Sequence, residues 1–270
     1  MKKIIIALCV LLYLVGCGTP KPSDPDTLVV SCTLDPHSKV LEFAKPILKE
    51  KYNIELKIVV LDDYYIFNKA LADGEVDANY FQHVPFFNME VEANGYDIVN
   101  ALGVHIEPFG FYSQSVSSVT DLKDGAEIVI SNSVADHGRI LRILEEAGLL
   151  KLKAGVDTLE ATLADIAENP KNLKFKEIKP ELLITAYDSN EGDLVAINGN
   201  YALQGGLSPA KDAVILEKGG AENPYVNIVA IKAGNEGEAK IKALLEVMSS
   251  SEVKGFISSN WSDGSVIAAE

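Results

Sequence analysis

The sequence predicts an α/β protein with two lobes and a ligand-binding cleft between them. Short apolar segments alternate with helix-like amphipathic segments in two successive series, a rhythm typical of parallel βαβ units. A last apolar segment at 226–231 follows the second series and would return the chain to the first lobe. Because open α/β sheets bind ligands beyond the carboxyl ends of their strands, we expect a pocket where the lobes meet.

The first lobe is predicted to span 28–109 together with 226–270. Its strands are expected at 28–33, 54–60, 76–80 and 226–231, and its helices at about 40–48, 68–74, 85–94, 238–248 and 252–258. Pro46 lies inside the first of these helices, where we expect it to kink the helix axis.

The second lobe is predicted to span 110–225, where a second series of alternating strands and helices begins. A turn is expected at 123–125, strands at 127–130, 173–178 and 194–197, and helices at about 138–147, 158–167 and 180–187. Two crossovers would then join the lobes, one after each series.

The N-terminus predicts export and a lipid anchor. Lys2 and Lys3 precede an apolar run at 4–15 that ends in Leu14-Val15-Gly16-Cys17, so residues 1–16 are predicted to be a signal peptide and Cys17 the lipidated first residue. The alternative, a simple membrane stub, is disfavoured because a spanning helix needs about 20 apolar residues. Residues 17–27 are small, polar and proline-containing, which predicts a flexible tether. We expect the protein on the extracytoplasmic face of the cell membrane.

Composition narrows the function classes. The net charge of −15 opposes nucleic-acid binding. Of the three cysteines, Cys9 leaves with the signal peptide and Cys17 carries lipid, so Cys32 has no partner for an intramolecular disulfide. No GxSxG, Walker or GxGxxG motif is present, which argues against an enzyme, and we predict no cofactor.

The only two arginines, Arg139 and Arg142, fall at the expected start of one helix. A cation there opposes the helix dipole, and a bound carboxylate between the guanidinium and the free backbone N–H groups would explain it. A solvated helix face, with both arginines paired to Glu145 and Glu146, explains the same pattern equally well.

Two further segments carry candidate ligand contacts. Asn198-Gly199-Asn200-Tyr201 follows a predicted strand, and an asparagine side chain can meet both an ammonium and a carboxylate, although an ordinary Asn-Gly turn is the simpler interpretation. The stretch 77–83 and its neighbours are rich in aromatic residues, which could clasp an apolar or thioether side chain or merely pack in the core.

The four histidines keep a metal site open as an alternative. His37, His83, His105 and His137 each fall at a predicted loop or strand end. A zinc site would need three or four of them to converge, and the chain has no HExxH motif and no paired CxxC, so we predict no metal.

Together these segments resemble the MetQ/NlpA family of methionine-binding lipoproteins over nearly the whole mature chain. The resemblance is carried by DANYFQH at 77–83 with Pro85, HIEPFGFYS at 105–113, GRIL at 138–141 and AINGNYA at 196–202. It implies a type II periplasmic-binding-protein fold, a free amino acid ligand, and delivery to an ABC permease with its ATPase by a monomeric binding protein.

The resemblance also implies roles for single residues. Arg139 would bind the ligand's carboxylate, and Asn198, Asn200 and Asn227 would hold its polar groups. The side-chain pocket would draw on four further residues, which are Tyr64, His83, Phe86 and His105. Methionine, as the L and also the D isomer, is the expected ligand, with a methionine-containing dipeptide or another small apolar amino acid as alternatives. A zinc-binding lipoprotein and a surface adhesin are the alternatives of another class.

Two departures from the family pattern bear on the ligand. Where the family tends to show Pro-Asn-Asp and then an asparagine before the Gly-Arg pair, this chain has Ser131-Asn132-Ser133 and then Asp136-His137. Ile66-Phe67-Asn68 lacks the proline expected before the asparagine. The first departure places an aspartate and a histidine near the ligand's polar end, so it could alter the ammonium contacts or admit another ligand.

Overall fold

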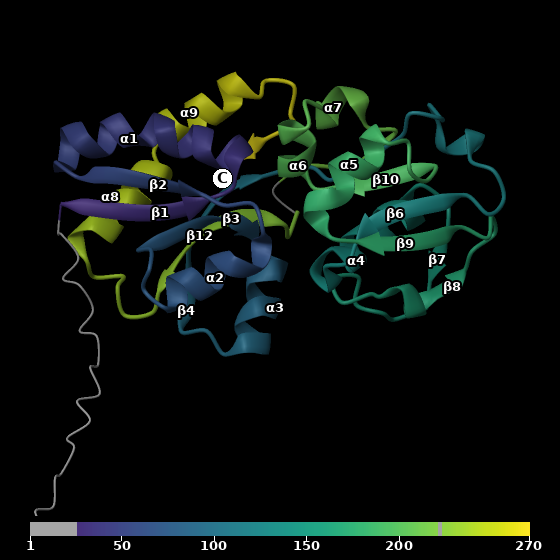
Figure 1. The fold of residues 1–270 in the computed structure, drawn as a ribbon, viewed down its shortest axis with the longest axis horizontal. Helices are drawn as coiled ribbons and strands as arrows, with labels where there is room; N and C mark the ends of the chain where they lie inside the picture. Colours follow the sequence, from purple (N-terminus) through teal and green to yellow (C-terminus); the bar gives the residue numbers. More distant parts are fainter. Residues whose placement is uncertain (1–25, 221–222) are drawn as a thin grey trace, which may run out of the picture.

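The computed structural model describes residues 26–220 and 223–270, which form two lobes side by side, each around its own sheet (Figure 1). The predicted signal peptide at 1–16, the predicted lipidation site Cys17 and the predicted tether up to residue 25 lie outside the described residues. Strand formation begins at Thr27, the last residue of the predicted tether. Within the described ranges, no helix has the length and apolar character needed to cross a membrane.

The first lobe contains a mixed six-stranded sheet in the order β13-β4-β12-β3-β1-β2. Its strands are β1 (Thr27–Cys32), β2 (Glu55–Val60), β3 (Ala78–His83), β4 (Ile98–Ile106), β12 (Val226–Lys232) and β13 (Ile267–Ala268). β1 pairs in parallel with β2 and β3, whereas β12 runs antiparallel between β3 and β4. The return of the chain to this sheet through β12 is therefore as predicted.

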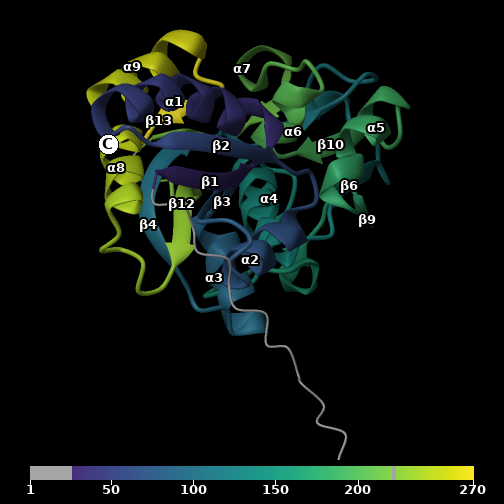
Figure 2. The same cartoon turned by 60° about the vertical axis from the view of Figure 1, so that its left-hand side comes forward.

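Helices cover both faces of this sheet (Figures 1 and 2). The helices are α1 (Lys39–Tyr52), α2 (Tyr64–Ala72), α3 (Val84–Asn94), α8 (Ala239–Met248) and α9 (Ser251–Asn260), with a short helical turn η1 (Leu34–Ser38) before α1. α1, α8 and α9 pack with β1 in one apolar core, and α2 and α3 pack with β12 in another. α1 continues as one helix through Pro46.

The second lobe contains a five-stranded sheet in the order β11-β5-β10-β6-β9 and a small two-stranded sheet. The strands are β5 (Gly110–Tyr112), β6 (Glu127–Ser131), β9 (Lys174–Ile178), β10 (Leu194–Ile197) and β11 (Ile215–Leu216), with β7 (Lys151–Leu152) and β8 (Ile166–Glu168) in the small sheet. The helices are α4 (Val134–Glu146), α5 (Leu183–Asp188), α6 (Gly199–Gln204) and α7 (Pro209–Asp212), and single helical turns lie at η2 (Val119–Asp121), η3 (Leu163–Asp165) and η4 (Pro180–Leu182).

Two local predictions for this lobe are wrong. The segment 158–167 contains only the turn η3 and the strand β8 instead of a helix. Its first part packs against α4 at Gly138, where an added Cβ would lie 2.3 Å from the carbonyl oxygen of Thr158. α4 begins at Val134 rather than near Gly138, so Arg139 lies in its second turn and not at its start.

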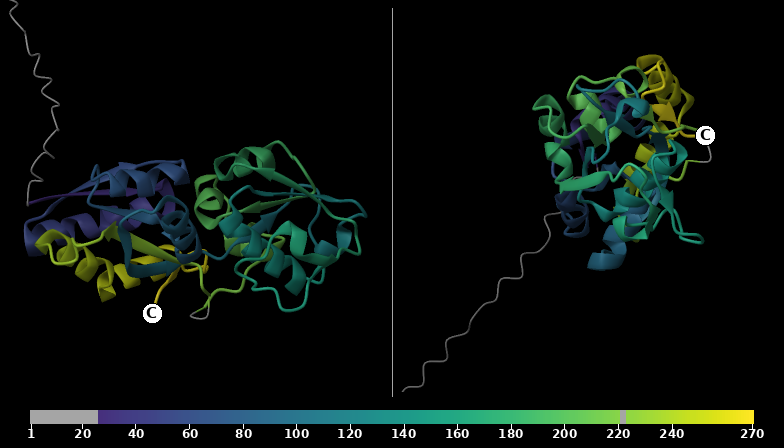
Figure 3. Two further views of the ribbon diagram at one scale, coloured as in Figure 1. Left: turned by 90° about the horizontal axis from the view of Figure 1, so that it is seen from below. Right: turned by 90° about the vertical axis from the view of Figure 1, so that its right-hand side faces the viewer.

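The fold brings several strand ends to the region between the lobes (Figure 3). β3 and β4 both run antiparallel to β12, so the carboxyl ends of β3 and β4 and the beginning of β12 share one edge of the first sheet. In the second sheet, β6 and β10 are parallel and end together. Side chains just after these strands are therefore placed to converge, as expected for open α/β sheets.

Candidate ligand-binding site

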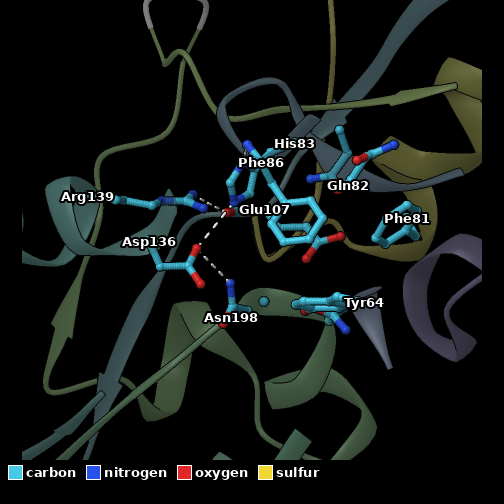
Figure 4. Close-up of a pocket in the computed structure, with 12 residues that line it drawn as sticks. Tyr64, Phe81, Gln82, His83, Phe86, Glu107, Asp136, Arg139 and Asn198 are labelled. Atoms are coloured by element: carbon cyan, nitrogen blue, oxygen red, sulfur yellow. Dashed lines mark hydrogen bonds and ion pairs between the residues drawn. The ribbon is translucent and has the colours of Figure 1, made fainter. Parts of the chain in front are cut away.

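A cavity with an empty volume of about 380 Å³ lies where the two lobes meet (Figure 4). The lining residues are Tyr64, Phe81, Gln82, His83, Phe86, Glu107, Asp136, Arg139, Asn198, Gly199, Asn200 and Asn227. Seven of the eight predicted ligand contacts are in this set, and His105 is not.

The aromatic end of the cavity comes from the first lobe. The ring of Tyr64, the first residue of α2, lies 5.9 Å from the rings of Phe81 and Phe86. Phe86 belongs to the first turn of α3, whose N-terminus is capped by the His83 side chain accepting a hydrogen bond from the Phe86 backbone N–H at 3.2 Å. These rings offer an apolar surface suited to an aliphatic or thioether chain.

The polar end contains Arg139, whose guanidinium is already held by protein groups. Nε and Nη2 donate to Oε2 of Glu217 at 3.0 and 2.5 Å, and Nη2 also donates to the Glu107 carbonyl at 2.7 Å. The guanidinium carbon lies 4.3 Å from the centre of the Tyr225 ring, in a cation–π contact. Arg139 was predicted to lie at the start of a helix, and a bound anion was inferred from that position, but the position is wrong. The anion beside Arg139 in this structure is the carboxylate of Glu217.

Glu217 connects the two arginines. Its second oxygen, Oε1, accepts a hydrogen bond from Arg142 Nη2 at 2.6 Å, and Arg142 also pairs with Glu146 at 3.2 Å. Burial alone would raise the pKa of Glu217, but the charge and hydrogen bonds of Arg139 more than offset this and leave the pKa below its ordinary value. Two guanidiniums and two carboxylates thus balance each other in charge.

Two asparagines present unused polar atoms. Within the described part of the chain, neither Oδ1 of Asn198 nor Nδ2 of Asn200 has a hydrogen-bond partner, although both atoms are buried. Buried polar atoms are normally satisfied, so an unpaired acceptor and an unpaired donor lining one cavity indicate a polar ligand. The opposite ends of the two amides are engaged: Asn198 Nδ2 donates to Asp136 at 3.2 Å, and Asn200 Oδ1 accepts from the Tyr64 hydroxyl at 2.5 Å.

Glu107 follows β4 and is nearly fully buried at the cavity wall. Its carboxylate packs so tightly against Gly199 that an added Cβ there would lie 2.8 Å from Oε2, and it accepts a hydrogen bond from the Asn200 backbone. This contact explains the glycine of the Asn-Gly-Asn motif. Burial raises the pKa of Glu107, although nearby positive groups and the Asn200 hydrogen bond counteract it.

Two histidines lie behind Glu107. Nε2 of His105 is 2.8 Å from Glu107 Oε1, and Nε2 of His37 is 3.5 Å from the same oxygen. The Tyr80 hydroxyl contacts Nδ1 of His105 at 2.5 Å, and the Thr33 hydroxyl contacts Nδ1 of His37 at 2.7 Å. Burial lowers the pKa of His37 to about 4 and that of His105 to about 3, which favours neutral rings.

His37, His105 and Glu107 form the one group of side chains among the described residues that could hold a metal ion together. Their potential ligand atoms all lie within 4.8 Å of one another. The remaining histidines lie elsewhere: His83 contacts Asp136, and Nε2 of His137 lies 3.0 Å from the Ser131 carbonyl and 3.2 Å from Glu177. Hydrogen bonds to Tyr80, Thr33 and Glu107 already account for the orientation of the two buried rings.

A hydrogen bond between His83 and Asp136 joins the lobes beside the cavity (Figure 4). His83 is the last residue of β3 in the first lobe, and Asp136 belongs to the first turn of α4 in the second, with 3.2 Å between Nε2 and Oδ1. Burial alone would raise the pKa of Asp136, but the hydrogen bond from His83 and the charge of Arg139 more than offset it, so that the pKa lies below its ordinary value.

Reasoning from sequence did not single out Glu107, Phe81, Gln82 or Glu217 as site residues. Phe81 and Gln82 lie inside the family segment 77–83, and Glu107 lies inside the family segment 105–113. Their position at the end of a strand could have identified them as site residues. Glu217 carried no such signal, because nothing near it in sequence suggests an arginine partner.

The fold and the site define a class: a two-lobed α/β substrate-binding protein with an interlobe cavity that is polar at one end and aromatic at the other. The NlpA lipoprotein family matches residues 28–270, and the chain belongs to this family. The predicted family and the predicted fold class are therefore confirmed.

Known proteins show the same likeness over almost the whole chain. The methionine-binding lipoprotein MetQ of Bacillus subtilis strain 168 is 48% identical over 273 residues, covering 99% of this chain and 98% of the relative. The structure of a nutrient-binding protein from Burkholderia cenocepacia bound to methionine has a TM-score of 0.84 and 37% identity, covering 90% of this chain and 100% of that one. A periplasmic substrate-binding protein of an ABC transporter from Coxiella burnetii has a TM-score of 0.83 and 35% identity, with the same coverage.

Proposed function

We propose that this chain is a lipid-anchored substrate-binding protein of an ABC importer, which captures methionine outside the cell membrane and delivers it to the permease. The observation that carries the proposal is the pair of unsatisfied amide atoms on Asn198 and Asn200 in a cavity that ends in aromatic rings. The relatives named as methionine-binding and the methionine-bound neighbour support the choice of ligand.

The ligand's polar groups have natural partners in this arrangement. Its carboxylate would meet Asn200 Nδ2 and the Arg139 guanidinium, whose Nη1 makes no hydrogen bond within residues 26–220 and 223–270. Its ammonium would meet Asn198 Oδ1 and the Glu107 carboxylate. A charged ligand group that completes such bonds gains about 1.5–3 kcal/mol from each of them.

The ligand's side chain would lie against Tyr64, Phe81 and Phe86. In this proposal His105 supports Glu107 rather than touching the ligand, because it lies behind that carboxylate and does not line the cavity. Asn227 lines the cavity and its Oδ1 is 3.1 Å from His37 Nε2, so it would link the ligand to the same buried network.

Capture would proceed by closure of the two lobes. The chain crosses between the lobes twice, between residues 109 and 110 and between residues 225 and 226. Hydrogen bonds between the two lobes close the cavity in the present arrangement, and among them are Tyr64 to Asn200, His83 to Asp136, and the Tyr201 hydroxyl to the Asp62 carbonyl at 2.7 Å. Hinge rotation at the two crossovers would break these bonds to admit ligand, a known type of domain motion.

The test is to release ligand from the purified full-length chain in detergent, identify it by mass spectrometry, and then titrate the stripped protein by calorimetry. L-methionine, D-methionine, Gly-Met and leucine form the ligand series, so that stereoisomer, dipeptide and general apolar preference are separated. Tight binding of methionine supports the proposal. Binding of leucine or Gly-Met in its place would assign another ligand, and binding of none would refute capture of this class.

One observation favours a second candidate, a metal-binding lipoprotein: the convergence of His37, His105 and Glu107. Zinc accepts such ligands, and the second ring nitrogen of each histidine already contacts a hydroxyl group, of Thr33 or of Tyr80, that would orient the ring of a ligating histidine. Calorimetric titration of the same stripped protein with zinc decides between the two, because a metal carrier would bind zinc tightly whether or not methionine is present. No comparable observation favours an adhesin.

A further inference from the structure

A hydrogen bond that joins the two lobes lies outside the ligand cavity. The hydroxyl of Tyr201, in α6 of the second lobe, donates to the backbone carbonyl of Asp62 in the first lobe at 2.7 Å. Neither residue lines the cavity, whereas the bond from Tyr64 to Asn200 is made by two lining residues. A ligand in the cavity can therefore rearrange the inner bond but cannot contact the outer one.

The Tyr201 side chain is held firmly at the seam between the lobes, where α6 lies (Figures 1 and 2). It is 4% exposed, and its ring centre lies 5.1 Å from that of Tyr64 in the other lobe. Burial, followed by the charges of Asp62 and Glu181, raises the pKa of the Tyr201 hydroxyl above its ordinary value. The hydroxyl therefore stays protonated and remains a hydrogen-bond donor.

The bond between Tyr201 and Asp62 lies far from the two crossovers. The chain leaves the first lobe just after β4 and returns to it at β12, and these two strands are neighbours in the first sheet. Asp62 follows β2, the edge strand three places beyond β12. Since neighbouring strands lie about 4.8 Å apart, β2 is roughly 14 Å from β12. A rotation about the crossovers therefore moves the end of β2 much further than the strands beside the hinge, and it has to break this bond.

A second hydrogen bond between the lobes lies close to the crossovers instead. The hydroxyl of Ser208, the residue before α7 in the second lobe, donates to the carboxylate of Asp263 in the first lobe at 2.9 Å. Asp263 comes shortly before β13, which pairs with the crossover strand β4 at the opposite edge of the sheet from β2. Hinge rotation moves this region little, so the Ser208 bond need not break when the lobes part.

We propose that Tyr201 is a positioning residue for ligand retention, which holds the closed lobes together from outside the cavity and slows the release of ligand. The inference rests on the proposed function, since it assumes that methionine leaves only when the lobes open. Each opening has to break the bond to Asp62, so the bond raises the barrier to opening. The contacts that recognise the ligand stay the same, so the bond affects how long a ligand is held and not which ligand is chosen.

The experiment measures methionine release from the full-length chain in detergent. The protein is loaded with radiolabelled L-methionine, excess unlabelled methionine is added, and the bound label is followed by rapid filtration. Tyr201→Phe keeps the ring packed against Tyr64 and should release methionine about fivefold faster, which corresponds to the loss of one neutral hydrogen bond. Its association rate should not fall, because the variant leaves the cavity wall intact. D-methionine, if bound, should show the same fold-change.

Ser208→Ala is the matched control, because it also removes a hydroxyl that bonds across the lobes, but beside the crossovers. It should leave the release rate unchanged. Equal release from Tyr201→Phe and the wild type would overturn the inference, as would equally fast release from Ser208→Ala. Slower association in Tyr201→Phe would indicate a damaged site and would overturn it too. In these cases the wild-type chain still binds methionine and the proposed function stands, whereas a wild-type chain that retains no methionine contradicts both.

Discussion

The two ends of the cavity are built by different physical means. The aromatic end is made of Tyr64, Phe81 and Phe86 from the first lobe, which pack ring against ring and need no exact electrostatic partner. The polar end is made of charged and amide groups from both lobes, each held by partners far away in the sequence. The comparison teaches that the aromatic end can tolerate a change of shape, whereas the polar end depends on a matched set of charges.

The largest effect should come from Arg139→Ala. The substitution removes one partner of the buried Glu217 carboxylate, so we expect the free energy of unfolding to fall by about 3 kcal/mol, measured by urea denaturation. The double variant Arg139→Ala/Glu217→Gln should regain most of the lost stability, because the buried carboxylate charge is gone. It should not regain the methionine binding that Arg139 supports. A single variant as stable as the wild type would show that the ion pair does not stabilise the polar end.

Acidification should weaken the network behind the polar end. The pKa values of His37 and His105 are lowered to about 4 and about 3, so between about pH 6.5 and pH 4 the unfolded chain binds more protons than the folded one. Stability is therefore lost as the pH falls through this window. Each histidine would contribute a loss of about 2 kcal/mol by about pH 5.

Glu107 acts in the opposite direction, because its raised pKa makes the folded state bind a proton more readily than the unfolded state. We therefore expect the net loss of stability to be smaller than the sum of the two histidine contributions, measured by urea denaturation at several pH values. His105→Gln should show a shallower dependence on pH, and equal slopes for the two proteins would contradict the assignment of His105 as a buried neutral ring.

The smallest effect should come from Tyr64→Phe, which keeps the aromatic end and removes its link to the polar end. The lost hydroxyl leaves Asn200 Oδ1 without its partner at 2.5 Å, so we expect about 1 kcal/mol less stability and methionine binding weaker by a few fold. Calorimetry and urea denaturation measure the two quantities. Tyr96→Phe, at a half-buried ring that does not line the cavity, is the matched control and should change neither.

Much of the site was visible in the sequence because it lies at strand ends. The apolar segments at 194–197 and 226–231 were recognisable as strands; Asn198 and Asn200 follow the first, and Asn227 lies within the second. The strand β4 was missed, because its central residues are only partly buried and show no clear alternation, and with it Glu107 was missed.

The sequence alone determined the alternating pattern of strands and helices, the resemblance to the family and the clustering of aromatic residues near one strand, because these features depend on neighbours in the chain. The tertiary structure decided which charges meet. Arg139 and Glu217 are 78 residues apart, and His83 and Asp136 are 53 apart and in different lobes. Local periodicity carries no information about such pairs, since their energy arises only when the fold buries both partners together.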